Sequence, residues 1–253
     1  MRKVLSIIHY EYKMQMKRFA TWGILLAALL ISLLDNFPSA ANLARLEFLS
    51  QPAYFIFRII GFDGLIMAFG LMFLLSNRFP VDEKTGVKPL MMASPMRKGQ
   101  YIMGKLAAAF IYTLTMLCVF LIINVSVHYI AVPLDVSLIE YIVLVCKVII
   151  TSIIPISIFV SFSAAVFPAM MDIRLFYLLA GILFVFNASY VNSADASPFY
   201  LITSGDLIRL IWVHPKYPQI DYGSVWANLI FLLVCGFGSS LLLIMKRKFW
   251  RAE

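Results

Sequence analysis

The sequence predicts an all-α polytopic membrane protein with six transmembrane helices. The chain of 253 residues is 62% hydrophobic and 13% charged, whereas a soluble domain is roughly half apolar and about a quarter charged. Apolar runs of the length that crosses a bilayer as a helix recur along the chain. The basic residues cluster at the ends of these runs, as they do in membrane proteins. No stretch remains for a separate soluble catalytic domain.

Residues 2–19 precede the first apolar run and are typical of a basic amphipathic helix. Leu5, Ile8 and Tyr12 fall near one helical face, and Lys13 lies off that face. A helix of this kind lies along the inner membrane surface, so we expect an interfacial helix here. The long charged region, which contains Glu11, disfavours a signal peptide.

Six apolar segments are the predicted spans. They cover about residues 20–34, 56–75, 106–130, 139–162, 175–190 and 225–245. Pro155 predicts a kink within the fourth span. Residues 191–224 form the longest outer segment, and their many apolar side chains predict a partly re-entrant or interfacial helix instead of a free loop.

The distribution of charge predicts the orientation of the spans. With the N-terminus inside, the inner segments hold 16 of the 21 Lys and Arg residues, the outer segments hold four, and Lys147 lies within a span. Cytoplasmic segments of membrane proteins carry this excess of Lys and Arg. We therefore expect both termini to be cytoplasmic and the protein to reside in the plasma membrane.

Several other functions are disfavoured by the same residues. The net charge of +8 comes from span ends, which disfavours a nucleic-acid partner. The three cysteines lie within apolar runs without CxxC spacing, which disfavours a disulfide framework or a zinc site. Gly99 to Lys105 match G-x-x-x-x-G-K, but Leu106 stands where a phosphate loop needs Ser or Thr. The three histidines do not converge with carboxylates in a catalytic spacing.

The longest inner polar segment covers residues 79–105, between the second and third predicted spans. Thr85 is suited to cap the start of a helix, and Gly86 to shape the entry into it. Leu90 and Met91 belong to an adaptable apolar surface. We expect Arg97 and the adjacent Lys98 to pair with acidic groups on a partner or with anionic lipid headgroups.

This segment also resembles a family motif. The residues that carry the resemblance are Glu83, Gly86, Leu90, Ser94, Pro95, Arg97, Tyr101, Gly104 and Lys105. They are similar to the pattern of the ABC transporter type-2 permease family, whose members are membrane subunits of bacterial exporters with separate ATPases. The layout of the whole chain, from the N-terminal amphipathic helix to the partly buried outer segment, resembles that family too.

The resemblance implies that the inner segment holds a coupling helix docked on an ABC ATPase subunit. The implied docking residues are Asp82, Glu83, Thr85, Gly86, Leu90, Met91, Ser94, Pro95, Arg97 and Tyr101. The interfacial helix, with Glu11, Tyr12 and Lys13, is implied to pack beside it. No catalytic residue, cofactor or metal is expected on this chain, because the partner would bind ATP and Mg²⁺. A second copy, or a similar permease, is implied to complete a dimer.

Polar residues within the predicted spans are candidates for the translocation path. Asp63 and Lys147 lie inside spans, where ionisable groups are functional hypotheses by default. They could pair with each other or face a water-filled path; a structural pair or snorkelling remains open. Asn124 and Asn187 are weaker candidates, because a polar residue in a span often bonds a neighbouring helix.

These observations together predict the permease subunit of an ATP-driven exporter. Phe, Met and Leu are abundant in the second and fifth predicted spans, which suits an amphipathic or hydrophobic cargo. A small peptide or toxin is the expected cargo, and a drug or antibiotic is the alternative. An ATPase-independent channel or assembly protein, and a membrane-embedded hydrolase, remain open as different classes.

Overall fold

A computed structural model describes residues 2–37, 39–46, 48–93, 96–132, 136–190, 206–213, 215, 219–246 and 249. Throughout these residues the regular structure is helical, and this described part of the chain contains no strand. Five of its helical segments are long and apolar enough to cross a membrane. The prediction of an all-α, multi-pass membrane protein is therefore confirmed.

The five long segments match five of the six predicted spans. They are Phe19–Asn36, Pro52–Lys84, Lys98–Ala131, Leu138–Met170 and Tyr222–Met245. The remaining prediction, 175–190, corresponds to α11 (Ile173–Tyr190), whose apolar part Ile173–Ala188 is shorter than the other five. The sequence thus located every apolar helix, but the lengths of several differ from those expected.

The N-terminal region forms two helices, α1 (Arg2–Met16) and α2 (Phe19–Asn36). The indole N–H of Trp22 donates to the carbonyl oxygen of Met16 across the break between them, at 2.9 Å. The face that α1 buries against α8 carries Glu11 and Gln15, whereas Leu5 is 61% exposed. Of the expected apolar face, Leu5 is therefore exposed, whereas Ile8 and Tyr12 are half-buried.

The second span is interrupted by a π-helical turn. It consists of α4 (Pro52–Arg58), η1 (Ile59–Asp63) and α5 (Gly64–Leu75). The short helix α3 (Ala40–Arg45) precedes it. Helix α6 (Arg78–Lys84), which forms the end of the long segment Pro52–Lys84, and α7 (Val87–Ala93) follow it. Such π-turns are frequent at functional sites, and this one contains Asp63.

The third span begins earlier than predicted. Helix α8 (Lys98–Ala131) starts directly after Arg97, whose backbone N–H donates to Oε1 of Gln100 at 3.2 Å. That bond occupies a donor at the helix start that has no intrahelical partner. Because the helix starts here, Tyr101 and Lys105 lie on one face of a helix, four residues apart, and not in a loop.

The fourth span contains a second π-turn next to its proline. It consists of α9 (Leu138–Val148), η2 (Ile149–Ile153) and α10 (Ile154–Met170). Pro155 lies in the first turn of α10, directly after η2 and inside the continuous segment Leu138–Met170, so its missing N–H leaves one carbonyl of the preceding turn without a helical donor. The segment continues to Met170, beyond the predicted end at 162, so Pro168 lies inside a helix and not in a turn.

The last elements are α12 (Asp206–Arg209) and α13 (Tyr222–Met245). Helix α13 packs along α10 at close range, because a Cβ at Gly236 would lie 2.8 Å from Cγ2 of Ile158. In the outer segment, Leu207 and Ile208 are buried, and Trp212 packs 4.7 Å from Tyr54 between ring centroids. The described part of this segment therefore folds back onto the bundle; residues 191–205 lie outside the described residues.

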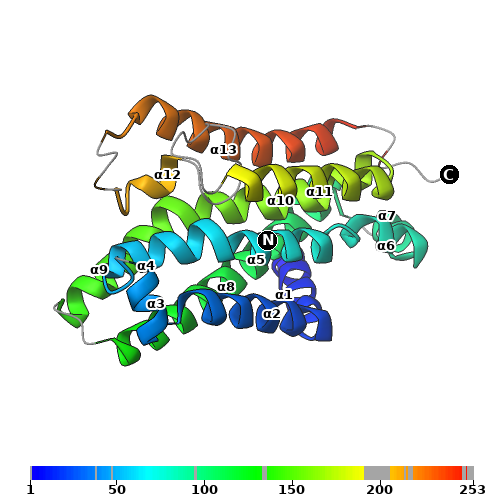
Figure 1. Cartoon of the computed structure of the whole chain (residues 1–253). Coiled ribbons are helices and arrows are strands. Elements are labelled where there is room, and N and C mark those ends of the chain that lie inside the picture. The colour runs from blue at the N-terminus through cyan, green and yellow to red at the C-terminus, as the bar shows by residue number, and fades with distance from the viewer. Residues whose placement is uncertain are drawn as a thin grey trace.

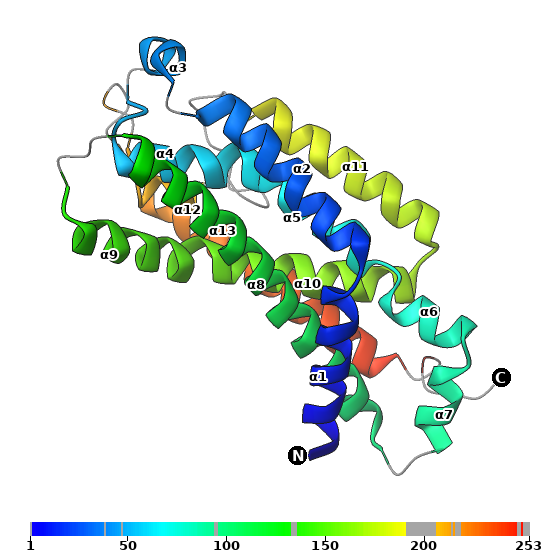
Figure 2. The same cartoon turned by 90° about the horizontal axis from the view of Figure 1, so that it is seen from below.

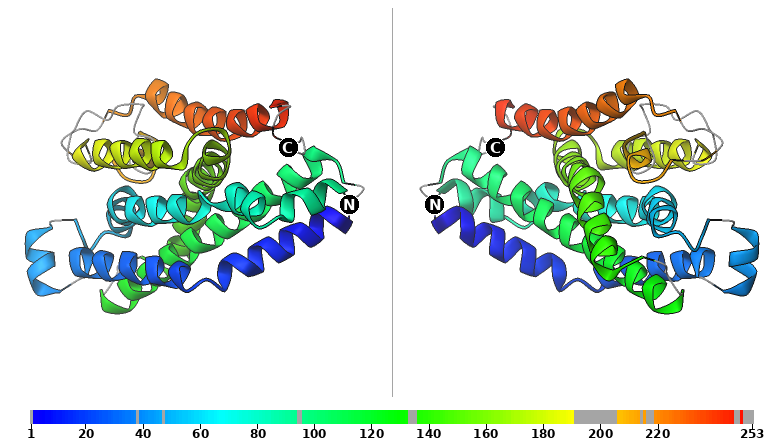
Figure 3. Two further views of the ribbon diagram at one scale, coloured as in Figure 1. Left: turned by 90° about the vertical axis from the view of Figure 1, so that its right-hand side faces the viewer. Right: turned by 90° about the vertical axis from the view of Figure 1, so that its left-hand side faces the viewer.

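The segments that connect the long helices lie at two opposite ends of the molecule. The start of α1, both α6 and α7, and the C-terminal end of α13 gather at one end (Figures 1 and 2). Helices α3, α4, α9 and α12 gather near the other end, and Figure 3 shows α3 far from the start of α1 and the end of α13. We call these the α6–α7 end and the α3–α4 end.

Candidate functional site

A buried ion cluster lies where α1, α6 and α8 meet, and we call it the α6–α8 ion cluster. It comprises Glu11, Arg78, Asp82, Tyr101 and Lys105. The Lys105 ammonium forms ion pairs with Asp82 and, at 3.2 Å, with Glu11. Arg78 pairs with Glu11 at 3.3 Å, and the Tyr101 hydroxyl donates to Asp82. Three elements that are distant in sequence are thereby joined by charged bonds.

Helical spacing explains how two short stretches supply most of this cluster. Arg78 and Asp82 are four residues apart on α6, and Tyr101 and Lys105 are four residues apart on α8, so each pair shares a helix face. All five side chains are buried, with Lys105 only 3% exposed. Removing one partner of such a buried pair leaves an uncompensated charge, which is strongly destabilising. The cluster therefore holds α6 rigidly against α8.

The connection between α6 and α7 is a tight turn. The Thr85 hydroxyl donates to the carbonyl oxygen of Val81 at 2.8 Å, so Thr85 closes α6. The expectation that Thr85 starts a helix is therefore wrong, because its side chain faces the turn behind it. Gly86 follows with φ +72°, a left-handed conformation that favours glycine.

Helix α7 presents an apolar side chain outward at the α6–α7 end. Leu90 is 72% exposed, whereas Met91 is half-buried. Glu83 is exposed and pairs with Lys88 at 2.9 Å. Arg97 is exposed beyond α7. The predicted docking residues Ser94 and Pro95 lie outside the described residues.

The C-terminal end of α13 is attached to the same region. The Lys98 ammonium donates to the carbonyl oxygens of Ile244, at 2.6 Å, and Lys246, at 2.8 Å. Cations are favourable at a helix C-terminus, where the last carbonyls lack helical partners. The Phe249 ring packs edge-on against Phe79, with centroids 5.6 Å apart. Lys98, expected to meet a partner or lipid, instead binds this chain.

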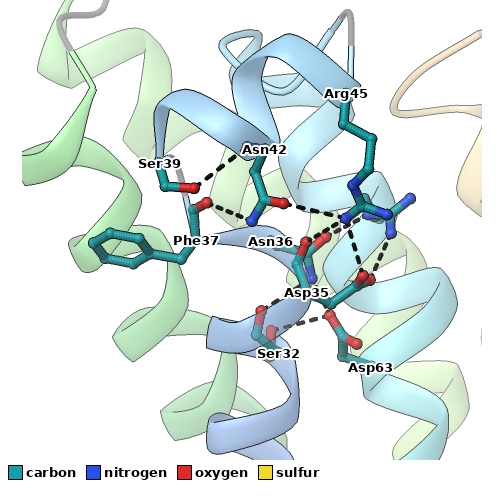
Figure 4. Close-up of polar contacts among 9 residues, drawn as sticks. Ser32, Asp35, Asn36, Phe37, Ser39, Asn42, Arg45 and Asp63 are labelled. Carbon is teal, nitrogen blue, oxygen red and sulfur yellow. Dashed lines mark hydrogen bonds and ion pairs between the residues drawn. The ribbon is translucent and has the colours of Figure 1, made fainter.

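A second polar network is buried near the α3–α4 end, between α2, η1 and α8. Asp63 is 4% exposed and accepts from the side-chain amide of Asn36. The Ser32 hydroxyl lies 3.0 Å from Asp63 Oδ2 and 2.9 Å from Asn124 Oδ1. Figure 4 shows Ser32 and Asn36 directed toward Asp63 from the end of α2. We call this group the Asp63 network.

Two arginines extend this network toward the surface. Arg58 donates to the side-chain oxygen of Asn36 and pairs with Asp35 at 2.5 Å. Arg45 reaches the same carboxylate at 3.4 Å (Figure 4). A chain of polar groups therefore runs from the buried Asp63 to the exposed Arg45.

The other predicted path residues do not join Asp63, apart from Asn124. The Lys147 ammonium donates to the carbonyl oxygen of Leu210 at 2.9 Å from an exposed position. The alternative in which Lys147 pairs with Asp63 is therefore not what the structure contains. Asn187 donates to the carbonyl oxygen of Leu183, within its own helix, at 2.7 Å.

The residues of the N-terminal helix have three different surroundings. Glu11 belongs to the α6–α8 ion cluster, Tyr12 is half-buried against the core, and Lys13 is exposed. In the sequence, Arg78 counts as an inner-side charge and Lys105 as part of the family motif, with no pairing predicted for either, and Ser32 and Asn36 are not singled out. The four-residue spacings on α6 and α8 were the available signal for the first two.

Comparison with protein-family models, with curated proteins and with solved structures found no match for this chain. The fold defines a multi-pass membrane protein by the length and composition of its five long helices.

Proposed function

We propose that the chain is the permease subunit of an ATP-driven ABC exporter. It moves an amphipathic or hydrophobic substrate, in the first place a small peptide or toxin, out across the plasma membrane. A separate ATPase subunit binds ATP and Mg²⁺ and docks on the α6–α7 end, which is cytoplasmic. The proposal includes a sixth span, α11, and a second permease chain that completes a dimer.

The observation that carries this proposal is the way α6 and α7 are mounted. Leu90 is 72% exposed on α7, and an exposed apolar side chain can serve as an anchor in a cleft on a partner protein. The hairpin of α6 and α7 is bonded to α8 through Asp82 and Lys105, and to α1 through Arg78 and Glu11. A displacement of α7 by a partner is therefore transmitted to a membrane-spanning helix.

A hollow between α5, α10 and α11 supports an apolar cargo. Its volume is about 190 Å³. Its lining includes Met72, Phe159, Phe167, Phe176 and Leu183. Helices α5 and α11 also meet through Phe69 and Phe184, whose ring centroids are 5.0 Å apart. Aromatic and methionine side chains bind varied apolar molecules because their surfaces are large or adaptable.

The test is whether an ATPase co-purifies with this chain when it is extracted in a mild detergent. We compare the wild-type chain with Leu90→Glu and with the double variant Glu83→Ala/Arg97→Ala. Leu43→Glu is the matched control, because Leu43 is a 38% exposed leucine on α3 at the α3–α4 end. Wild type and control should retain an ATPase that hydrolyses ATP, and the Leu90→Glu variant should lose it.

Two results overturn the proposal. One is the absence of any ATPase from the wild-type preparation under every mild condition, which favours an ATPase-independent channel. The other is equal retention by Leu90→Glu and Leu43→Glu, which removes the docking role of α7.

A further inference from the structure

Arg78 lines a groove between α1, α6 and α8 and carries two hydrogen-bond donors without acceptors. The groove has a volume of about 460 Å³. Its lining includes Glu11, Arg18, Arg78, Asp82 and Lys105. Among the described residues, Nε and Nη2 of Arg78 have no hydrogen-bond partner, although the side chain is 5% exposed. Buried polar groups are nearly always bonded, so these two donors call for an acceptor.

The two donors form one edge of the guanidinium group. Arg78 uses Nη1 for Glu11, so the buried Nε–Nη2 edge is a parallel pair of unpaired N–H groups. This fork matches two oxygens of a phosphate or carboxylate, and such bidentate bonds are among the strongest in proteins. The missing acceptor is therefore best supplied by a tetrahedral or planar oxyanion.

The charges around the groove favour an anion with one negative charge. Its walls carry the three cations Arg18, Arg78 and Lys105 against the two carboxylates Glu11 and Asp82. Lys105 is already paired with both carboxylates, and Arg78 with one of them. One positive charge is left over, which a single phosphodiester would neutralise.

The position of the groove indicates where the anion comes from. Arg18 immediately precedes the apolar helix α2, whose first residue, Phe19, is 90% exposed. Trp22, in the first turn of α2, is 49% exposed, and tryptophan is enriched at the membrane–water interface. The groove wall also includes apolar side chains, among them Ile7 and Val87. Phosphate groups, basic side chains and acyl chains meet at this depth in a bilayer.

We propose that this groove binds the phosphodiester of an anionic phospholipid. The Nε–Nη2 edge of Arg78 grips the phosphate oxygens, and Arg18 supplies the second cation. The apolar wall accommodates the upper part of an acyl chain. This binding does not depend on the proposed ATPase partner, and the isolated full-length chain is sufficient to test it.

The experiment is native mass spectrometry of the detergent-purified chain titrated with phosphatidylglycerol. Arg78→Lys retains the charge and the reach to Glu11 but removes the fork. Arg18→Gln removes the second cation and leaves the ion cluster intact. Lys17→Gln is the matched control, because Lys17 is exposed, adjacent in sequence and absent from the groove lining. All four proteins are first compared in lipid-free detergent for their unfolding temperature.

The wild type and Lys17→Gln should bind one tight phosphatidylglycerol per chain. Arg78→Lys and Arg18→Gln should each weaken that binding about tenfold, as expected for loss of a charge-assisted contact. If Arg78→Lys does not fold, Arg18→Gln decides the outcome alone. Equal binding by Arg18→Gln and Lys17→Gln overturns the proposal. So does equal affinity for phosphatidylcholine, or equal occupancy by inorganic phosphate, which would make the groove a site for small anions.

Discussion

Lys105 on α8 and Asp82 on α6 form an ion pair within the protein, with side chains 2% and 10% exposed. The Lys105 ammonium also donates to the backbone carbonyl of Arg78 at 3.0 Å. One side chain thus bonds α6 at two points, Arg78 and Asp82, to the start of a membrane-spanning helix. This arrangement makes the hairpin of α6 and α7 an extension of α8 and not a mobile loop.

Asp82→Ala should be far more destabilising than Glu83→Ala. The first change leaves Lys105 with an incomplete set of partners and the buried Tyr101 hydroxyl without its acceptor, a loss of about 3 kcal/mol. The Glu83 side chain is 61% exposed, and its partner Lys88, 9% exposed, keeps a cation–π contact with Phe249 at 4.7 Å. Loss of this half-exposed pair should therefore cost about 1 kcal/mol. Chemical unfolding in detergent micelles measures both. Equal losses for the two variants would contradict a structural role for the cluster.

Gly86→Ala should weaken the junction between α6 and α7. The site has open space for a methyl group, but its φ of +72° costs an L-residue about 1 kcal/mol. Gly99→Ala is the control, since that position also has open space and lies in the first turn of α8. Hydrogen exchange of the α7 amides should rise in Gly86→Ala and stay unchanged in Gly99→Ala. Unchanged exchange in both would mean that the turn is not strained by a side chain.

Tyr141→Phe should destabilise the contact between α8 and α9 by about 1–3 kcal/mol, the cost of an unpaired buried polar group. His128 lies 3.0 Å from the carbonyl oxygen of Leu49 through Nε2, so Nε2 carries the hydrogen. Nδ1 then accepts from the Tyr141 hydroxyl at 2.9 Å. Tyr129→Phe is the control, since Tyr129 is 40% exposed. Thermal unfolding should separate the two, and a larger loss in Tyr129→Phe would contradict this hydrogen-bond assignment.

Asp63→Asn should be tolerated, whereas Asp63→Leu should lower stability by about 2 kcal/mol. The Ser32 hydroxyl has one hydrogen and lies beside two acceptors, Asp63 and Asn124. Ser32 and Asn36 both donate to Oδ2 of Asp63, so an amide at position 63 that places its oxygen there still accepts from both side chains. Leucine removes that acceptor.

Lys147→Gln is the control for the two Asp63 variants. The exposed Lys147 ammonium donates to the carbonyl oxygen of Leu210, outside the Asp63 network. Unfolding transitions of the three variants give the comparison. A loss for Asp63→Asn as large as that for Asp63→Leu would show that the negative charge itself is required.

Much of the fold follows from the sequence because the length of an apolar run can be read from the run itself. The runs that became α2, α8 and α13 are recognisable without any knowledge of their neighbours, since a bilayer-crossing helix needs about 20 apolar residues. The excess of basic residues at alternate span ends likewise predicted that α6, α7, the start of α1 and the end of α13 share one end. The start of α8 was missed because Lys98 and Gln100 are polar, although a helix accepts them readily.

The sequence by itself determined that this chain is a helical membrane protein, and it located the apolar helices. Tertiary structure decided which charges are buried. Arg78 and Glu11 are separated by 67 positions and meet only because α1 packs along α8. Ser32 and Asn124 are 92 positions apart and meet through α2 and α8. A charge at a span end looks the same in sequence whether water or another helix faces it, so its partner is fixed by helix packing alone.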